Sequence, residues 1–206
     1  MVADQDVRGY SREMSLKNPL GDLEISDADT MRALSHPVRL AILSRLQRYG
    51  PATATQLSAH VDATPSVASW HLRHLAQFGL LTEAESPDKR QRYWQAVSRG
   101  FRFEIPDDAE GRAAGHRLRD AMHAANLAQL SGWVQNIQPH LPPEWDQVAG
   151  ASNTRVDVTA SEAAGIIGKF EEILAPFVNR DAADLPADAR STRFLRYSMP
   201  AADDAE

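Results

Sequence analysis

The segment from Thr53 to Phe78 limits the possible fold more than any other part of the chain. Thr53 is a residue type that caps helix N-termini, and the stretch TATQLSAHV that contains it predicts a short helix. Asp62-Ala63-Thr64 breaks that helix. Thr64 as a cap and Pro65 at the first helical position then predict a second helix, which stops at Gly79. Two short helices joined by a tight break form a helix-turn-helix.

The flanking residues extend this motif in both directions. A short helix is predicted over Asp27 to Leu34, and a longer one starts at Pro37 and ends at Gly50-Pro51. After Gly79 the apolar period changes to that of strands, over Leu80 to Glu85 and Gln91 to Val97, with a turn-rich basic tip between them. A helix-turn-helix followed by a basic hairpin is a winged helix.

The charge of the chain is unevenly distributed. The whole sequence of 206 residues has a net charge of −6, which by itself argues against a nucleic-acid partner. Between Arg32 and Arg102, however, ten basic and four acidic residues give +6, so the remainder carries −12. A basic segment inside an acidic chain indicates that only this segment meets a polyanion.

The second helix of the motif is the expected reader of DNA, because the N-terminal part of such a helix enters the major groove. Its outer face offers hydroxyl groups, a guanidinium and an indole, which bind base edges or phosphates. The hairpin tip offers cations for the DNA backbone or the minor groove. The predicted DNA-binding residues are Thr64, Ser66, Ser69, Trp70, Arg73, Lys89, Arg90 and Arg92.

These same residues carry a family resemblance. The stretch LSHPVRLAILSRL resembles the entry helix of ArsR-type winged-helix repressors, and SVASWHLRHLAQFGLL resembles their recognition helix and its exit into the wing. Ser69 to Leu72 matches the family's S-x-H-L pattern, Gly79-Leu80 its G-L ending, and Tyr93 the tyrosine that opens the second wing strand.

The resemblance covers roughly residues 27 to 103. It implies a homodimeric transcription regulator, in many members a repressor, that binds a palindromic operator. It also gives Ser66, Ser69, Trp70 and Arg73 a DNA-contact role by position. Trp70 departs from the polar residue that is usual there.

The second half predicts a long helix and then a small strand-helix-strand region. An apolar stripe runs along Arg112 to Ile137, which is a candidate dimer seam. Strands are expected at Arg155 to Thr159 and Thr192 to Met199, on either side of a helix that opens with the capping box Thr159 to Glu162. This region has enough apolar surface for a small core of its own. An effector pocket there would be lined by Phe170, Phe177 and Tyr197.

A metal site is the weaker of the possible ligand sites. The chain has no cysteine, so disulfides and thiolate ligands are excluded, and a cytoplasmic location fits. The remaining candidates are His116, Asp120 and His123, spaced so that they share one helix face. The alternative is an exposed polar face. No metal or other cofactor is expected.

Catalytic motifs and membrane-spanning apolar runs are absent from the sequence, so we expect neither an enzyme nor a membrane protein. The predicted fold class is α+β, mainly α. The predicted division is a flexible N-terminal arm (1–26), a winged helix-turn-helix (27–103) and a dimerisation or effector region (104–206).

The predicted function is a sequence-specific, homodimeric regulator of transcription that binds double-stranded DNA and acts as a repressor, with a possible small-molecule effector. The alternatives left open are a protein-interaction module that keeps the winged shape, and an effector-binding protein in which the winged helix is not the main reader of DNA. Trp70 is alternatively a contact to the dimer partner, and the wing arginines are alternatively a solvated tip.

Overall fold

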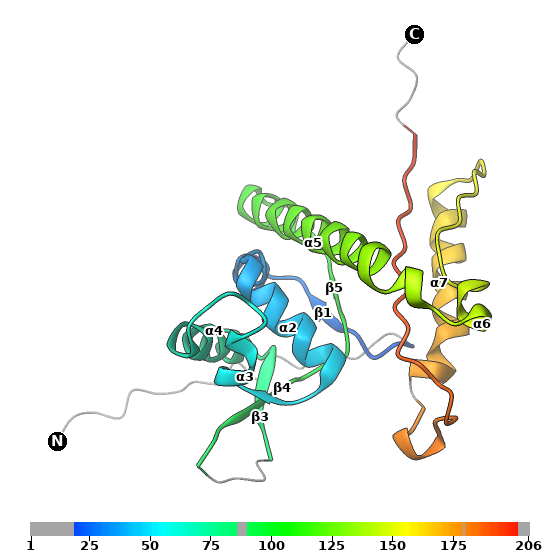
Figure 1. Cartoon of the computed structure of the whole chain (residues 1–206). Helices are drawn as coiled ribbons and strands as arrows, with labels where there is room; N and C mark the ends of the chain where they lie inside the picture. Colours follow the sequence, from blue (N-terminus) through cyan, green and yellow to red (C-terminus); the bar gives the residue numbers. More distant parts are fainter. Residues whose placement is uncertain (1–18, 86–89, 179, 202–206) are drawn as a thin grey trace, which may run out of the picture. The chain divides into compact units, whose positions relative to one another are not determined.

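The computed structural model describes residues 19–85, 90–178 and 180–201, and it is mainly helical with two small sheets (Figure 1). This agrees with the predicted α+β class. In chain order the elements are β1 (Leu23–Ile25), α1 (Ala28–Leu34), α2 (Pro37–Tyr49), β2 (Ala52–Thr53), α3 (Ala54–Ser58), α4 (Pro65–Gln77), β3 (Leu81–Ala84), β4 (Tyr93–Ala96), β5 (Phe101–Phe103), α5 (Ala109–Asn136), η1 (Gln138–His140), α6 (Pro143–Asp146), α7 (Ala160–Val178) and η2 (Ala182–Asp184).

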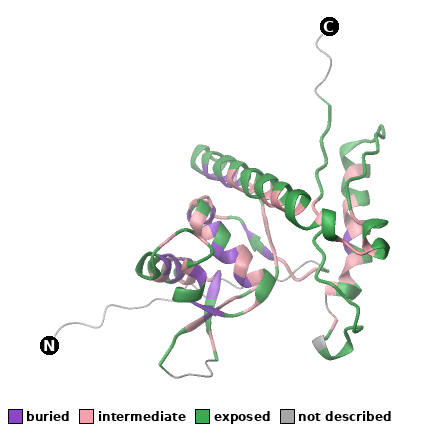
Figure 2. Cartoon of the chain, in the orientation of Figure 1, coloured by how far each residue is buried: buried purple, intermediate pink, exposed green. Residues whose placement is uncertain are grey.

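The chain forms two compact units, residues 1–119 and 120–206. The first unit contains the helix-turn-helix and a continuous apolar core, whose buried residues are purple in Figure 2. Its fully buried large side chains come from α1 to α5 and from the residue before β3: Met31, Leu34, Ile42, Leu57, Leu72, Leu75, Leu80 and Leu118. This core fixes the positions of α3 and α4.

Side-chain caps begin the helices, and those of Thr53 and Thr64 were predicted. The Asp27 carboxylate accepts a hydrogen bond from the Thr30 amide at 2.9 Å and begins α1. Thr53 and Gln56 form a reciprocal capping box that begins α3. The Thr64 hydroxyl oxygen accepts from the Val67 amide at 3.3 Å and begins α4. Local side-chain chemistry therefore sets the start of both helices of the helix-turn-helix.

The wing is part of a three-stranded antiparallel sheet with the order β2-β4-β3. In its register Glu83 on β3 lies opposite Trp94 on β4, and Ala52 on β2 lies on the other side of Trp94. Trp94 is buried and anchors the hairpin to the body of the unit. The two-residue strand β2 was not predicted, because it is too short to show a strand period.

The prediction of a flexible arm over residues 1–26 is wrong for its last part. Leu23 and Ile25 are buried, and β1 pairs in parallel with β5, with Leu23 opposite Phe101. The Leu23 amide also donates to the Gly100 carbonyl at 3.0 Å. A three-residue strand whose partner lies far along the chain leaves almost no pattern in the sequence. Residues 1–18 lie outside the described part of the chain.

The second unit has no strand among its described residues, so the predictions of strands at 155–159 and 192–199 are wrong. Both segments are extended but have no strand partner, and a strand is stable only when a neighbour completes its hydrogen bonds. Instead, Arg193 donates to Gln129 of α5, and Arg196 lies 3.7 Å from the Glu171 carboxylate of α7. Polar contacts to helices replace the expected sheet.

The predicted core of this region does not form either. Of the described residues from 120 onward, only Glu171 is buried. The predicted helix is present as α7, and Thr159 and Glu162 form its capping box, with the Thr159 amide donating to the Glu162 carboxylate at 2.8 Å. The backbone N–H of Thr159 lowers the pKa of the Glu162 carboxyl. One helix without a packed second layer leaves its apolar residues exposed.

In the described part of the chain, no helix is both long enough and apolar enough to cross a bilayer.

Candidate nucleic-acid interface

Helix α4 has one buried face and one exposed face. Ala68, His71, Leu72 and Leu75 point into the core, at the spacing that a helix requires for one side. The exposed face carries Ser66, Val67, Trp70 and Arg73, with the half-buried Ser69 beside them. No residue of α4 is acidic, so no carboxylate on this helix repels a phosphate. The helix ends where Gly79 takes a φ of +68°, a conformation that favours glycine.

Two of the predicted DNA-binding side chains on α4 are joined. The Arg73 guanidinium donates a hydrogen bond to the Ser69 hydroxyl at 2.6 Å. This bond uses one of the five N–H donors of arginine and holds the group along the helix. The remaining donors are available to a base edge or a phosphate, so Ser69 positions the cation that the sequence analysis assigned to DNA.

Trp70 is exposed, and its indole ring contacts two histidine rings of the same helix. Its indole stacks on the His74 imidazole, with ring centroids 5.4 Å apart and an interplanar angle of 10°. It also meets the edge of His71 at 4.9 Å. Two imidazole rings therefore contact the indole, and 53% of the Trp70 surface remains exposed.

Below Trp70, two histidines from different helices meet. The rings of His71 and His36 are 4.8 Å apart, and His36 caps α2 by accepting from the Val38 amide at 3.2 Å. Burial, and then the nearby His36, Arg39 and His74, lower the pKa of His71. Burial and Arg39 likewise lower the pKa of His36 and of His74. The sequence alone gave His36 no partner, because the contact depends on how α2 packs against α4.

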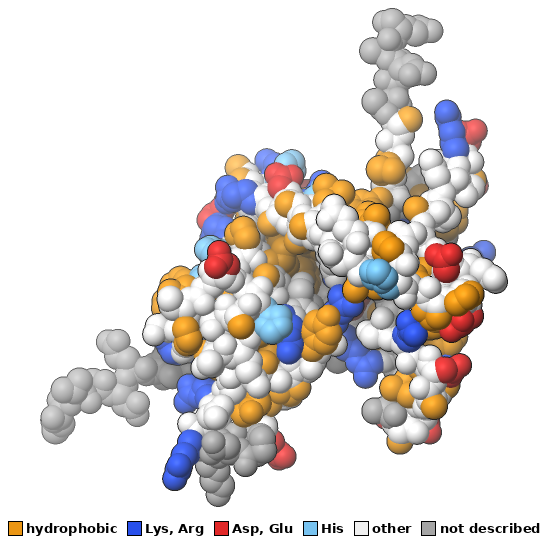
Figure 3. All heavy atoms as spheres, in the orientation of Figure 1, with side chains coloured by type: hydrophobic (Ala, Val, Ile, Leu, Met, Phe, Trp, Pro, Cys, Tyr) orange, Lys and Arg blue, Asp and Glu red, His pale blue; other side chains and the backbone are white. Residues whose placement is uncertain are grey.

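The sequence predicts a basic tip on the wing, and in the structure one of its arginines, Arg92, is paired with a carboxylate. The Arg92 guanidinium lies 3.2 Å from the Glu83 carboxylate on the neighbouring strand and 5.8 Å from the ring centre of Trp94. Arg90 is exposed, and Lys89 lies outside the described residues. In Figure 3, arginine side chains, drawn in blue, are visible at the end of the first unit that carries the β3–β4 hairpin.

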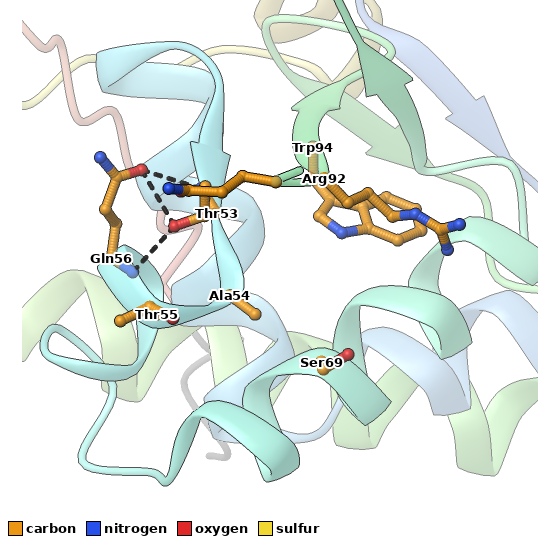
Figure 4. A pocket seen from close by; sticks show the side chains of 8 residues that line it. Thr53, Ala54, Thr55, Gln56, Ser69, Arg92 and Trp94 are labelled. Carbon is orange, nitrogen blue, oxygen red and sulfur yellow. Dashed lines mark hydrogen bonds between the residues drawn. The ribbon is translucent and has the colours of Figure 1, made fainter. Parts of the chain in front are cut away.

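A shallow groove connects the wing with the helix-turn-helix (Figure 4). It has a volume of about 390 Å³ and lies between α3, α4 and β4. Its lining consists of Thr53, Ala54, Thr55, Gln56, Ser69, Gln91, Arg92 and Trp94. Hydroxyl, amide and guanidinium donors thus surround one surface that runs from α4 to the wing.

The sequence analysis predicted only Ser69 and Arg92 among these groove residues, and it missed the exposed polar residues Thr55, Gln56 and Gln91. Gln56 was hidden by its structural role, since its Oε1 accepts from the Thr53 amide at 2.9 Å. Its amide nitrogen is the donor end. Uncharged polar residues in a short helix carry no nucleic-acid signal of their own, and only the fold brings them beside Ser69 and Arg92.

The proposed metal ligands do not form a site. Within the described residues, no group of three histidine, aspartate or glutamate side chains comes together so as to hold a metal ion, and this includes His116, Asp120 and His123. The three are exposed on α5, and the His123 ring lies 5.7 Å from that of Tyr197. Of the expected effector-pocket residues, Phe177 and Tyr197 are exposed and Phe170 lies beneath the Arg196 guanidinium.

Comparison with known proteins supports the reading of the first unit. Residues 34–84 match the family model of a helix-turn-helix domain. No curated protein matches the chain.

Solved structures that resemble the chain include a possible transcriptional regulator for arsenical resistance, with 29% identity, a TM-score of 0.31, and coverage of 50% of this chain and 94% of that one. The YusO protein from Bacillus subtilis has 16% identity and a TM-score of 0.32, with coverage of 70% and 80%. ZitR from Lactococcus lactis, in its C30AH42A mutant apo form, has 14% identity and a TM-score of 0.31, with coverage of 66% and 83%. TM-scores at this level leave the fold assignment to the chain's own elements and to the family match.

The elements and the family match define the class. The first unit is a winged helix-turn-helix domain, and its residues 34–84 are similar to the helix-turn-helix domain family.

Proposed function

We propose that the chain is a sequence-specific regulator in which α4 reads base edges in the major groove and the wing holds the DNA backbone. The observation that carries this proposal is the division of α4 into a core-packed face and an exposed face. The exposed face combines Ser66, Trp70 and Arg73 and contains no carboxylate. A helix of this kind is rigidly positioned and chemically suited to base edges.

The groove between α3, α4 and β4 has the chemistry of a backbone site. Thr55, Gln56 and Gln91 are exposed at its rim, and Ser69 and Arg92 line it. Such side chains hydrogen-bond phosphate oxygens, which fixes the orientation of a protein on the duplex without reading sequence. In our proposal one strand of DNA passes along this groove while α4 occupies the major groove.

The finer proposal is an ArsR-type repressor that acts as a homodimer on an inverted repeat. One winged helix covers only a half-site, and a two-fold dimer reads a palindrome. An exposed stripe of Leu127, Leu130 and Val134 on α5, continued by Ile137 directly after the helix, supports a dimer seam, because its 3-4-3 spacing is that of helices that pair. A protein bound to operator DNA blocks other proteins from binding the same site, and repression follows directly from such a block.

We further propose that the protein acts in the cytoplasm, has no catalytic activity, and changes its DNA affinity when a small-molecule effector binds. The region 104–206 is in this view the dimerisation and effector part, following the winged domain of 27–103. The exposed apolar surface of α7 supports a binding role for it, since Ile166, Ile173 and Phe177 are all exposed.

Selection of bound sequences from a random duplex pool, with the full chain at near-physiological salt, tests the proposal. We expect an enriched inverted repeat whose half-sites lie about one helical turn apart. A matched selection with Arg73→Ala should lose enrichment at the base positions that Arg73 contacts. If neither the free chain nor the chain with a metabolite extract enriches any sequence, α4 is a protein-interaction surface and the proposal is wrong.

A further inference from the structure

The exposed face of α4 contains an apolar patch that phosphate binding does not explain. Val67 has 44% of its surface exposed and Trp70 has 53%. They are three residues apart, so they are neighbours on the same side of the helix. Ser66 and Arg73 flank them on the same exposed face. A large indole in the middle of a polar recognition face needs an apolar partner or remains in water at a cost.

The indole is held in a defined orientation. His74 covers one of its faces in a nearly parallel stack, and His71 meets it with its edge. Because burial and then Arg39 lower the pKa of His74, its imidazole is neutral near pH 7, and no positive charge lies directly against the indole. Trp70 therefore presents an ordered, uncharged surface.

The geometry points to a thymine contact: we infer that Trp70 recognises the C5-methyl group of a thymine in the operator half-site. This inference rests on the proposed function. Of the four bases, thymine alone carries an apolar group in the major groove, and apolar side chains discriminate it by that methyl. Val67 extends the same apolar surface toward the helix N-terminus, the end that lies deepest in the groove.

The test replaces each thymine of the selected operator, one at a time, by deoxyuridine, which removes only the methyl group. At one position in each half-site we expect the affinity of the wild-type chain to fall about four-fold, the fold-change that corresponds to about 0.8 kcal/mol for one buried carbon. Trp70→Ala should bind the thymine and deoxyuridine duplexes equally. Because Trp70 is exposed, this variant should fold, which a thermal melt checks.

Ser66→Ala is the matched control, since Ser66 lies on the same face of α4 and has no apolar surface to lose. This variant should keep the four-fold sensitivity to deoxyuridine. Equal affinity of the wild-type chain for every deoxyuridine duplex would overturn the inference, as would an unchanged sensitivity in Trp70→Ala. In either case the operator is still bound, so the proposed function stands.

Three further results distinguish failure of the thymine contact from failure of the proposed function. If the chain selects an operator without any thymine in its half-sites, the thymine contact is wrong and DNA reading is not. If no duplex is selected at all, both fail. Trp70→Ala that leaves DNA binding intact but converts a dimer to a monomer would assign the indole to a second copy of the chain, and this also overturns the inference.

Discussion

The imidazole rings of His36 and His71 lie 4.8 Å apart, where the cap of α2 meets the buried face of α4. The Arg39 guanidinium on α2 opposes a positive charge on either ring, and a proton on His74 of α4 would further oppose one on His71. Among the described residues, the Nδ1 atom of His71 has no hydrogen-bond partner. The packing between the entry helix and the recognition helix therefore depends on neutral imidazoles.

Stability should consequently fall on mild acidification. The pKa values of His36, His71 and His74 are lowered from 6.5, so between 6.5 and their folded values the unfolded chain binds more protons than the folded one. Folding stability is then full above pH 6.5 and is lost as the pH falls through this window. Thermal melts at pH 7.5 and pH 5.5 should show a lower Tm at the acidic pH.

His71→Phe tests the source of that loss. It keeps a ring at the contact but removes the titration, so the difference in Tm between the two pH values should become smaller. The carboxyl pKa values of Asp108 and Glu162 are lowered from 3.8 and 4.5, so these groups change stability only below those pH values. They do not contribute to a difference in Tm between pH 7.5 and pH 5.5. An equal pH difference in the variant and the wild type would contradict the assignment to His71.

The start of α4 should depend on one hydroxyl group. Thr64→Ala removes the acceptor for the Val67 amide and should cost about 1 kcal/mol in the free energy of unfolding. Ser66→Ala, two positions further on, should cost less than about 0.5 kcal/mol because its side chain is exposed and makes no cap. Urea denaturation of both variants measures the two costs, and a Thr64→Ala cost no larger than that of Ser66→Ala speaks against the cap.

The wing should bind DNA more strongly when Glu83 is neutralised. Glu83→Gln releases the Arg92 guanidinium from its ion pair at 3.2 Å and removes a negative charge from the hairpin. Affinity for random duplex should rise, and the salt slope should steepen by about one, the value for one additional phosphate contact. Glu85→Gln removes an equal charge without releasing Arg92 and is the control. Salt titrations in which the two variants match would show that Arg92 gains nothing from its release.

The apolar stripe on α5 should set the oligomeric state. Val134→Glu puts a carboxylate into the proposed seam between two copies, while Ala128→Glu adds the same charge on the opposite side of the helix. Both positions are exposed in the single chain, so neither change should unfold it. Sedimentation should show a dimer for the wild type and for Ala128→Glu, and a monomer for Val134→Glu. A dimeric Val134→Glu variant would place the seam elsewhere.

The sequence predicts best where local chemistry decides the structure. Thr53, Thr64, Pro65 and Gly79 define the helix-turn-helix through caps and backbone conformation, and the structure confirms these boundaries. The β1–β5 pair was missed because three-residue strands depend on a distant partner rather than on a local pattern.

The errors in the second half have the same origin. Residues 155–159 alternate like a strand, but alternation does not supply the neighbour that a sheet requires, and no strand forms there. Within the candidate interface, the helical pattern predicted that Ser66, Trp70 and Arg73 lie on the outer face of α4, and all three are exposed there. The Glu83–Arg92 pair and the groove residues Thr55 and Gln91 depend on strand register and packing, which spacing does not reveal.

The central claim is that α4 reads sequence while the wing holds the backbone. Its most direct test is the affinity of Arg73→Ala and Arg90→Ala for the selected operator and for random duplex, measured across a range of salt concentrations. We predict that Arg73→Ala loses affinity for the operator by about 1–3 kcal/mol and much less for random DNA. Arg90→Ala should weaken binding to both duplexes alike and reduce the salt slope by about one. Equal losses on both duplexes for Arg73→Ala would contradict the claim.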